Sequence, residues 1–307
     1  MHSSRLALPT FLTIGAQKCG TTWLSKMLVQ HPEVMIPAEK ELHFFDKTAR
    51  YARGLEWYCE QFSSDQPVVA RGELTPNYFW TLGDDEKPEF GQDAQLIPQL
   101  VADALPDVQL ILMLRDPVAR AISAFYHHIR HGPVSPDDSI LDVSDRLGIE
   151  SMGRYDVHLA RWLEHFPKHR ILVLIYEDDL TDAAKPETLR RVFRHIGVSE
   201  DFEPEHLYTR YNGTGLHFRM RVANSPFAIL SRERIVRHLP GWLTGMERWK
   251  VRVTHHEITE LQRRFEPHVL RLETLLGRRM ESWRELAERR QESSVTEGPE
   301  ALTQTIS

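Results

Sequence analysis

Residue types that bind anions are concentrated in one short segment near the N-terminus. The run FLTIGAQKCGTTW passes from apolar residues through Gly15 and Gly20 to Thr21 and Thr22. A strand, a glycine-bearing loop and the first turn of a helix, in this order, direct free backbone N–H groups and the positive end of the helix dipole to one point. The threonine hydroxyls add donors, and Lys18 adds a positive charge. We therefore predict that this loop binds an anion.

The order of residues in this loop differs from the Walker A sequence of nucleoside triphosphatases. That motif, G-x-x-x-x-G-K-[ST], places lysine directly after the second glycine. Here Thr21 follows Gly20, and Lys18 precedes that glycine by two residues. A P-loop kinase-like phosphotransferase is therefore a weaker alternative, and a solvated lysine in a tight turn is the alternative without function.

A second segment places an arginine and a serine in a spacing suited to phosphate. The apolar run 108–114 continues as RDPVARAIS, so Arg115 follows it directly, and Ser123 lies on the helix that Pro117 can start. An arginine fork with a hydroxyl binds phosphate well. Taken alone, however, the segment favours a structural role, in which Arg115 pairs with a local carboxylate and Ser123 caps or packs. Ligands of parallel α/β sheets bind beyond the carboxyl ends of the strands, where both segments would lie. The two sites together suggest a ligand with two separated anionic groups.

Apolar runs and helical patterns alternate along the chain. The runs are rich in β-branched and aliphatic residues, as in parallel strands that are covered on both faces. This alternation indicates an α/β fold, a three-layer sandwich with a central parallel sheet. The expected strands are 9–15, 68–74, 108–114 and 170–176; the expected helices are 21–31, 93–104, 117–131, 154–166, 186–196, 255–276 and 278–290; and 83–92 is expected to be a loop.

Length and composition exclude several classes of protein. The chain has 307 residues, of which 41% are hydrophobic and 27% charged, as in a globular protein with a full core. Its two cysteines are too few for a disulfide framework or a structural zinc site. No apolar run approaches the roughly 20 residues of a membrane span. We expect a cytoplasmic protein with one domain over residues 1–290 and a polar, disordered tail over 291–307.

Charge and histidine placement argue against nucleic acid and metal. The net charge of −6 offers no large basic surface to a long polyanion. The chain has 16 histidines, but the adjacent pairs at 127–128 and 255–256 point to different faces of their helices. A zinc site would need further ligands at suitable spacing. We therefore expect no nucleic-acid partner and no bound metal.

The order of the motifs resembles that of sulfotransferases, which use 3′-phosphoadenosine 5′-phosphosulfate (PAPS). The segments KCGTTW and RDPVARAIS resemble the two nucleotide motifs of that family. The segment ELHFFD resembles the E-x-H-F-F-D signature of the heparan-sulfate-type branch, and GELTPNYF matches the loop after its next strand. The segments GRY and ILVLIYEDDL look like the bacterial members. The resemblance covers roughly residues 9–200.

The resemblance implies transfer of a sulfuryl group from PAPS to an acceptor hydroxyl, without a metal. The loop at the end of the first strand would then be a P-loop-like phosphosulfate-binding loop. Lys18 would contact the bridging oxygen that becomes charged as the S–O bond breaks, and Arg115 with Ser123 would hold the 3′-phosphate. Trp23 matches an adenine-stacking tryptophan of the cytosolic enzymes, or it is a core aromatic. The implied nucleotide-binding residues are Lys18, Cys19, Gly20, Thr21, Thr22, Trp23, Arg115 and Ser123.

The same resemblance implies a general base for the acceptor. Glu41 matches the catalytic glutamate of the heparan-type branch by its position before Leu-His-Phe-Phe. A carboxylate within hydrogen-bond reach can take the proton of a hydroxyl that attacks sulfur in line. His43 could be the base instead, as histidine is in the cytosolic branch, or it could orient the acceptor. We expect Glu39, by contrast, to be an exposed loop carboxylate with no catalytic role, so it serves as the comparison for Glu41.

Departures from the family pattern limit the choice of acceptor. Leu74 stands where the glycosaminoglycan enzymes carry a lysine, and their disulfide, membrane anchor and basic groove have no counterpart here. We therefore expect a small-molecule or carbohydrate acceptor: a sugar, a glycolipid or a secondary metabolite. In relatives, a basic loop near the C-terminus closes over the 3′-phosphate. The loop 211–214, with Arg219 and Arg221, is only a poor match to it. A non-catalytic nucleotide-binding protein on the same fold is the remaining alternative.

Overall fold

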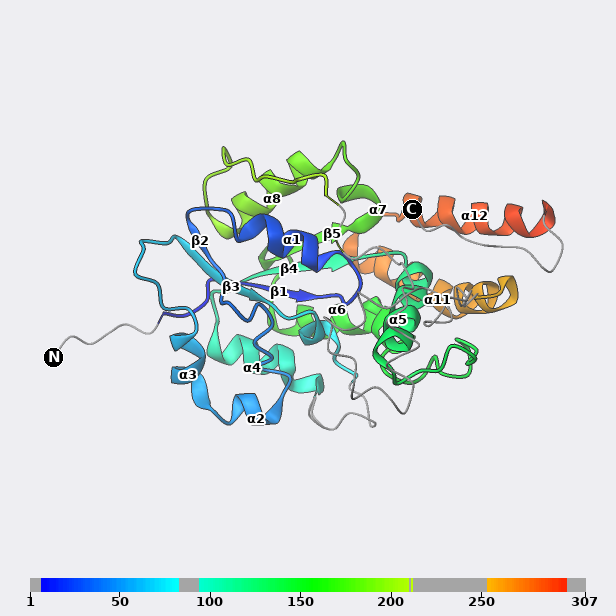
Figure 1. The fold of residues 1–307 in the computed structure, drawn as a ribbon, viewed down its shortest axis with the longest axis horizontal. Coiled ribbons are helices and arrows are strands. Elements are labelled where there is room, and N and C mark those ends of the chain that lie inside the picture. The colour runs from blue at the N-terminus through cyan, green and yellow to red at the C-terminus, as the bar shows by residue number, and fades with distance from the viewer. Residues whose placement is uncertain (1–6, 83–93, 210, 212–252, 297–307) are drawn as a thin grey trace, which may run out of the picture.

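The computed structural model describes residues 7–82, 94–209, 211 and 253–296. At its centre, five parallel strands form one sheet (Figure 1). Four of them are the predicted strands, each within two residues of the expected bounds, and the fifth, β2, is too short to leave a periodic pattern. In the order of the sheet, the strands are β2 (Val34–Met35), β3 (Ala70–Leu74), β1 (Phe11–Gly15), β4 (Gln109–Leu114) and β5 (Ile171–Ile175).

The strands lie in the core because most of their side chains are apolar. Every residue of β1 is buried, and in β4 only Gln109 is partly exposed. Phe11 of β1 aligns with Gly72 of β3 on one side and with Gln109 of β4 on the other. A Cβ atom at Gly72 would lie 2.4 Å from the carbonyl oxygen of Phe11, so glycine permits this close pairing. Because the strands are parallel, the carboxyl ends of β3, β1 and β4 meet at one edge of the sheet.

Helices cover both faces of the sheet. The described α-helices are α1 (Thr21–Leu28), α2 (Thr48–Tyr51), α3 (Gly54–Glu60), α4 (Ile97–Ala104), α5 (Pro117–His131), α6 (Tyr155–His165), α7 (Tyr176–Asp179), α8 (Lys185–Ile196), α11 (His255–Leu276) and α12 (Glu281–Thr296). Short 3-10 helices are η1 (Pro76–Phe79), η3 (Ala94–Leu96), η4 (Ser151–Gly153) and η5 (Lys168–Arg170). In Figure 1, α1 and α8 lie on one side of the sheet, and α4 and α6 lie on the other. The predicted α/β sandwich with a central parallel sheet is confirmed.

Long helices match their predicted bounds better than short ones. The bounds of α5 and α11 are those expected, because Pro117 starts α5 and left-handed glycines, Gly132 and Gly277, end the two helices. The predicted tail is wrong at its start, since α12 continues to Thr296. The short helices α2, α3 and α7 have no counterpart among the expected elements. The loop 83–92 and most of the late basic loop lie outside the described residues.

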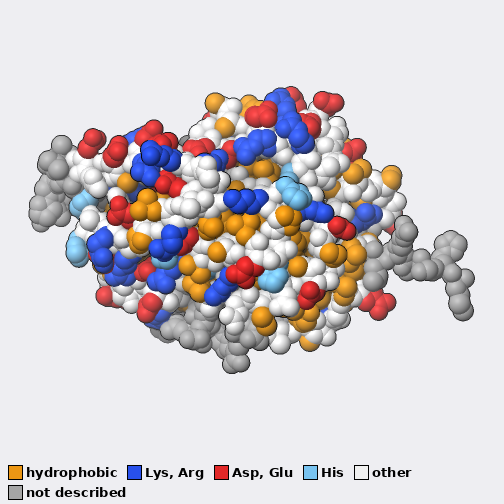
Figure 2. Space-filling model, turned by 180° about the vertical axis from the view of Figure 1, so that it is seen from behind, with side chains coloured by type: hydrophobic (Ala, Val, Ile, Leu, Met, Phe, Trp, Pro, Cys, Tyr) orange, Lys and Arg blue, Asp and Glu red, His pale blue; other side chains and the backbone are white. Residues whose placement is uncertain are grey.

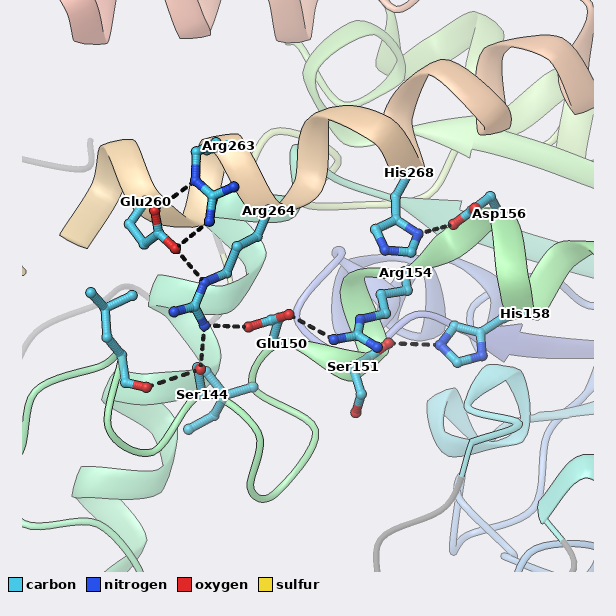
Figure 3. Close-up of polar contacts among 12 residues, drawn as sticks. Ser144, Glu150, Ser151, Arg154, Asp156, His158, Glu260, Arg263, Arg264 and His268 are labelled. Atoms are coloured by element: carbon cyan, nitrogen blue, oxygen red, sulfur yellow. Dashed lines mark hydrogen bonds and ion pairs between the residues drawn. The ribbon is translucent and has the colours of Figure 1, made fainter. Parts of the chain in front are cut away.

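Ion pairs to two buried carboxylates attach α11 to the segment around η4 and the start of α6. Glu150 accepts hydrogen bonds from Arg154 at 2.8 Å and from Arg264 of α11 at 2.9 Å (Figure 3). Asp156 of α6 lies 2.7 Å from the Nδ1 atom of His268, on the next turns of α11. The C-terminal helices are therefore attached to the same body as the sheet.

Candidate active site

The predicted anion loop connects β1 to α1 as expected. Gly20 caps the helix in a left-handed conformation with a φ of 95°, and a Cβ atom there would meet the Cδ2 atom of Leu180 at 2.7 Å. Lys18 is also left-handed, with a φ of 68°. Thr21 and Thr22 begin α1, and the first backbone N–H groups of a helix point out of its N-terminus. The loop thus has the form that binds anions at a helix N-terminus.

Lys18 lies among other cations. Burial, followed by the positive charges of Arg130, Arg115 and Arg120, lowers its pKa to about 8. Among the residues that the structure describes, no carboxylate forms an ion pair with Lys18. A lysine in such surroundings is stabilised by an anion that arrives from outside the protein.

Arg115, at the end of β4, has only a partial partner. Its Nε atom is buried, makes no hydrogen bond, and lies 3.9 Å from a carboxylate oxygen of Glu177. Its guanidinium lies 4.8 Å from the centre of the Tyr176 ring. Ser123 is half-buried on the following helix, α5. The predicted phosphate arginine therefore keeps donors that a ligand could use.

Arg120 is a buried cation that sequence reasoning did not single out. It is fully buried, and its Nη2 atom donates to the backbone carbonyls of Gly148 and Ile149. Its Nε and Nη1 atoms have no hydrogen-bond partner. Arg120 occurs in the same RDPVAR segment as Arg115, but its role depends on burial, which the motif alone does not reveal. It adds to the positive charge around Lys18.

Two residues of the predicted nucleotide set point into the core. Trp23 is 5% exposed, and its indole N–H donates to the carbonyl of Leu207 at 2.9 Å. Cys19 is fully buried with its Sγ atom 3.7 Å from the Tyr155 hydroxyl, and burial raises its pKa to about 11. The core position agrees with the structural alternative for Trp23. Direct contact of either side chain with a nucleotide stays a prediction.

The predicted acceptor residues form a row in the loop after β2. The Nδ1 atom of His43 lies 2.8 Å from Asp46, and its Nε2 atom lies 3.7 Å from the carboxylate of Glu41. Asp46 is buried, whereas the Glu41 side chain is 36% exposed and pairs with Lys40 at 2.6 Å. The row therefore runs from a buried carboxylate, through an imidazole, to a carboxylate that solvent or an acceptor can reach.

A buried glutamate holds this loop in place. Glu73, at the end of β3, is fully buried, and its carboxylate accepts hydrogen bonds from the Tyr58, Tyr78 and Thr75 hydroxyls and from the backbone N–H of Leu42. Burial raises the pKa of Glu73, while the four donors favour its charged form. Because Leu42 lies between Glu41 and His43, the bond to its N–H fixes the backbone that carries both side chains. In the sequence, the signal for this role was the position of Glu73, an acidic residue within a predicted strand.

The sheet order brings the two halves of the site together. β1 lies between β3 and β4, so the Lys18 loop lies between the loop that Glu73 holds and the turn that carries Arg115. Close packing supports this placement, since a Cβ atom at Gly15 would lie 2.4 Å from the Cβ atom of Phe79, in the helix that follows β3. The predicted cations and carboxylates thus share one edge of the sheet.

A cavity, a metal-ligand group or a membrane-spanning helix in the described chain would also bear on its function. A cavity of about 640 Å³ lies between α8 and the segment 200–209 and is lined by none of the predicted site residues. Within the described ranges, no group of three histidine, cysteine or acidic residues could hold a metal ion. None of the helices described has the length and apolar character needed to cross a bilayer.

Comparisons with known proteins agree on one family. The model of the sulfotransferase domain matches residues 8–214. Heparan sulfate glucosamine 3-O-sulfotransferase 5 of Mus musculus is 28% identical over 225 residues, which is 70% of this chain and 60% of that protein. The mouse 3-O-sulfotransferase 3B1 is 31% identical over 209 residues, 66% of this chain and 49% of that protein. This chain therefore spans about three fifths or less of the curated relatives.

A solved bacterial structure has the same fold. The sulfotransferase from Alicyclobacillus acidocaldarius superposes with a TM-score of 0.61 at 24% identity, covering 91% of this chain and 99% of that one.

Proposed function

This chain belongs to the sulfotransferase family, and we propose that it transfers the sulfuryl group of PAPS to an acceptor hydroxyl by in-line displacement. The observation that carries the proposal is the cation group at the ends of β1 and β4. Lys18 has a pKa of about 8 because it is buried beside Arg130, Arg115 and Arg120. A ligand with several negative charges, such as PAPS, would relieve this repulsion. The missing Walker lysine disfavours a kinase-like phosphotransferase.

In this proposal, the loop and the arginine divide the nucleotide between them. The N-terminus of α1, with Thr21 and Thr22, would bind the 5′-phosphosulfate. Lys18 would donate to the bridging oxygen, where charge develops as the S–O bond breaks, and would thus stabilise the transition state more than the ground state. Arg115 and Ser123 would bind the 3′-phosphate. Among the described residues, Arg115 pairs with a carboxylate only through its 3.9 Å contact with Glu177, which supports this role.

Glu41 would accept the proton of the acceptor hydroxyl. Its carboxylate is partly exposed, whereas that of Asp46 is buried and already bound to His43. Asp46 would hold the imidazole in one tautomer, with the Nε2 atom directed toward Glu41 and the acceptor. Lys40 pairs with Glu41 at 2.6 Å and so places a positive charge beside the carboxylate.

The acceptor would be a sugar, a glycolipid or a secondary metabolite rather than a long polyanion. Leu74, which replaces the lysine of the glycosaminoglycan enzymes, is fully buried in the core. On the face in Figure 2, basic and acidic side chains are interspersed. The thiols of Cys19 and Cys59 are both unpaired, which supports our proposal of a cytoplasmic location.

Calorimetry with 3′-phosphoadenosine 5′-phosphate (PAP) tests the proposal. We expect PAP to bind in the presence of a metal chelator, and Arg115→Ala to weaken binding by about 1.5–3 kcal/mol through loss of a charge-assisted contact. Arg170→Ala is the matched control, because Arg170 precedes β5 at the opposite edge of the sheet and pairs with Asp107. Binding of ATP with Mg²⁺ but not of PAP would instead support a kinase-like enzyme. Transfer from labelled PAPS to a library of hydroxyl acceptors would then identify the acceptor, and no transfer despite PAP binding would favour a non-catalytic protein.

A further inference from the structure

The helix α12 reaches the turn that carries Arg115, although it lies outside the matched residues 8–214. The indole N–H of Trp283 donates to Glu177 at 2.8 Å. Arg290 donates to both carboxylate oxygens of Asp116, and both of these side chains are buried. The two contacts connect α12 with the start of α7 and with the turn between β4 and α5.

Glu177 and Asp116 make contacts next to Arg115. The backbone N–H of Asp116 lies 3.2 Å from each carboxylate oxygen of Glu177, and the Nε atom of Arg115 lies 3.9 Å from one of them. The Asp116 side chain also caps α5, since it accepts from the N–H of Ala119 at 2.7 Å. The two carboxylates therefore fix the backbone directly after Arg115 and the start of the helix that carries Ser123.

The charges in this group depend on α12. Burial, followed by the nearby charge of Asp116, raises the pKa of Glu177 to about 7. Arg290 is the cation that pairs with Asp116. Without Arg290, Asp116 would be a buried carboxylate next to Arg115 in the chain, and a buried unpaired charge is costly. Asp116 would then attract the Arg115 guanidinium away from a ligand.

We propose that α12 is part of the nucleotide site: Trp283 and Arg290 hold Glu177 and Asp116, and these carboxylates position Arg115 for the 3′-phosphate. Trp283 and Arg290 are positioning residues in this arrangement, because they act through the carboxylates. The inference rests on the proposed function, which assigns the 3′-phosphate to Arg115.

A double-mutant cycle on PAP affinity tests this coupling. Trp283→Phe removes the N–H donor and keeps an aromatic ring. We expect it to weaken PAP binding by about fivefold or more, and to change binding of adenosine 5′-phosphate, which lacks the 3′-phosphate, by less than about twofold. In an Arg115→Ala background, the same substitution should change PAP affinity by less than about twofold. A purely structural role would weaken both nucleotides, and would do so in both backgrounds.

Trp162→Phe is the matched control, because the Trp162 indole N–H is buried on α6 without a partner. Arg290→Lys is the second variant, which keeps the positive charge and loses the bidentate contact with Asp116. If Trp283→Phe does not fold, Arg290→Lys is measured in the same double-mutant cycle. Equal losses in the wild-type and Arg115→Ala backgrounds would overturn the inference. Failure of wild-type protein to bind PAP would instead overturn the proposed function. PAP binding that depends on Arg115 but not on α12 would refute the inference alone.

Discussion

Replacing Lys18 by methionine should stabilise the protein at pH 7 and remove its affinity for PAP. The substitution keeps the apolar stem of the side chain and removes the charge. In the folded protein, that charge is buried beside Arg130, Arg115 and Arg120, whereas in the unfolded chain it is solvated. The same charge would bind the phosphosulfate, so stability and function should change in opposite directions.

The expected size follows from the pKa of Lys18. Its fall from 10.5 to about 8 corresponds to an upper limit of about 3.5 kcal/mol, at about 1.4 kcal/mol for each pKa unit. Because the pKa is lower in the folded state, the unfolded chain binds more protons between pH 8 and 10.5. The free energy of unfolding contributed by Lys18 therefore rises across this interval. The advantage of Lys18→Met should be full below pH 8 and disappear near pH 10.5.

Urea denaturation of wild-type protein, Lys18→Met and Lys26→Met measures this effect. Lys26 is the control, because it is exposed on the last turn of α1 and should change stability by less than about 0.5 kcal/mol. PAP at about 100 times its Kd should add about 2.7 kcal/mol to the wild-type and Lys26→Met proteins, and almost nothing to Lys18→Met. If Lys18→Met is less stable than wild type at pH 7, the repulsion inferred among these cations is wrong.

Three further results are expected. Glu41→Gln should lower turnover by roughly 10²–10⁴-fold with unchanged PAP affinity, whereas the control Glu39→Gln should stay active. His43→Asn should lose less activity than Glu41→Gln. The reverse ranking in the transfer assay would make His43 the base. Glu73→Gln should lower the free energy of unfolding by about 1–3 kcal/mol, because its amide presents N–H donors to a cage of donors; an unchanged urea midpoint would contradict that cage. Burial and the charge of Lys18 lower the pKa of His127 to about 3, so its ring signals in NMR spectra should not titrate between pH 5 and 8.

Local patterns were sufficient to predict most of the fold. Strands such as β4 are continuous apolar runs, and α11 has a capping box at Thr254 and a left-handed glycine at its end, both of which are legible in the sequence. The strand β2 has two residues, and the helices α2 and α3 have four and seven, which are too few for a strand or helical period to be recognised. Their positions depend on packing against the rest of the chain.

The candidate site divides in the same way. Lys18 and Arg115 could be predicted because each belongs to a strand, loop and helix that are consecutive in the chain. Glu73 and Glu177 could not, because their partners are distant: Leu42 is 31 residues from Glu73, and Trp283 is 106 residues from Glu177. Such partners are brought together only by the completed sheet and the C-terminal helices.

Backbone conformation gives the two halves of the site a common physical character. Lys18 and His43 are non-glycine residues with φ values of 68° and 52°, and the left-handed region costs such residues about 1–2 kcal/mol. The surrounding structure must maintain these conformations. Next to His43, the backbone N–H of Leu42 donates to the Glu73 carboxylate. The backbone N–H of His43 donates to the Thr75 hydroxyl at 3.4 Å. Strain held by a rigid frame is typical of sites where a side chain must point toward a ligand rather than into its lowest-energy packing. The half of the site that carries His43 therefore depends on groups that do not themselves carry out the chemistry.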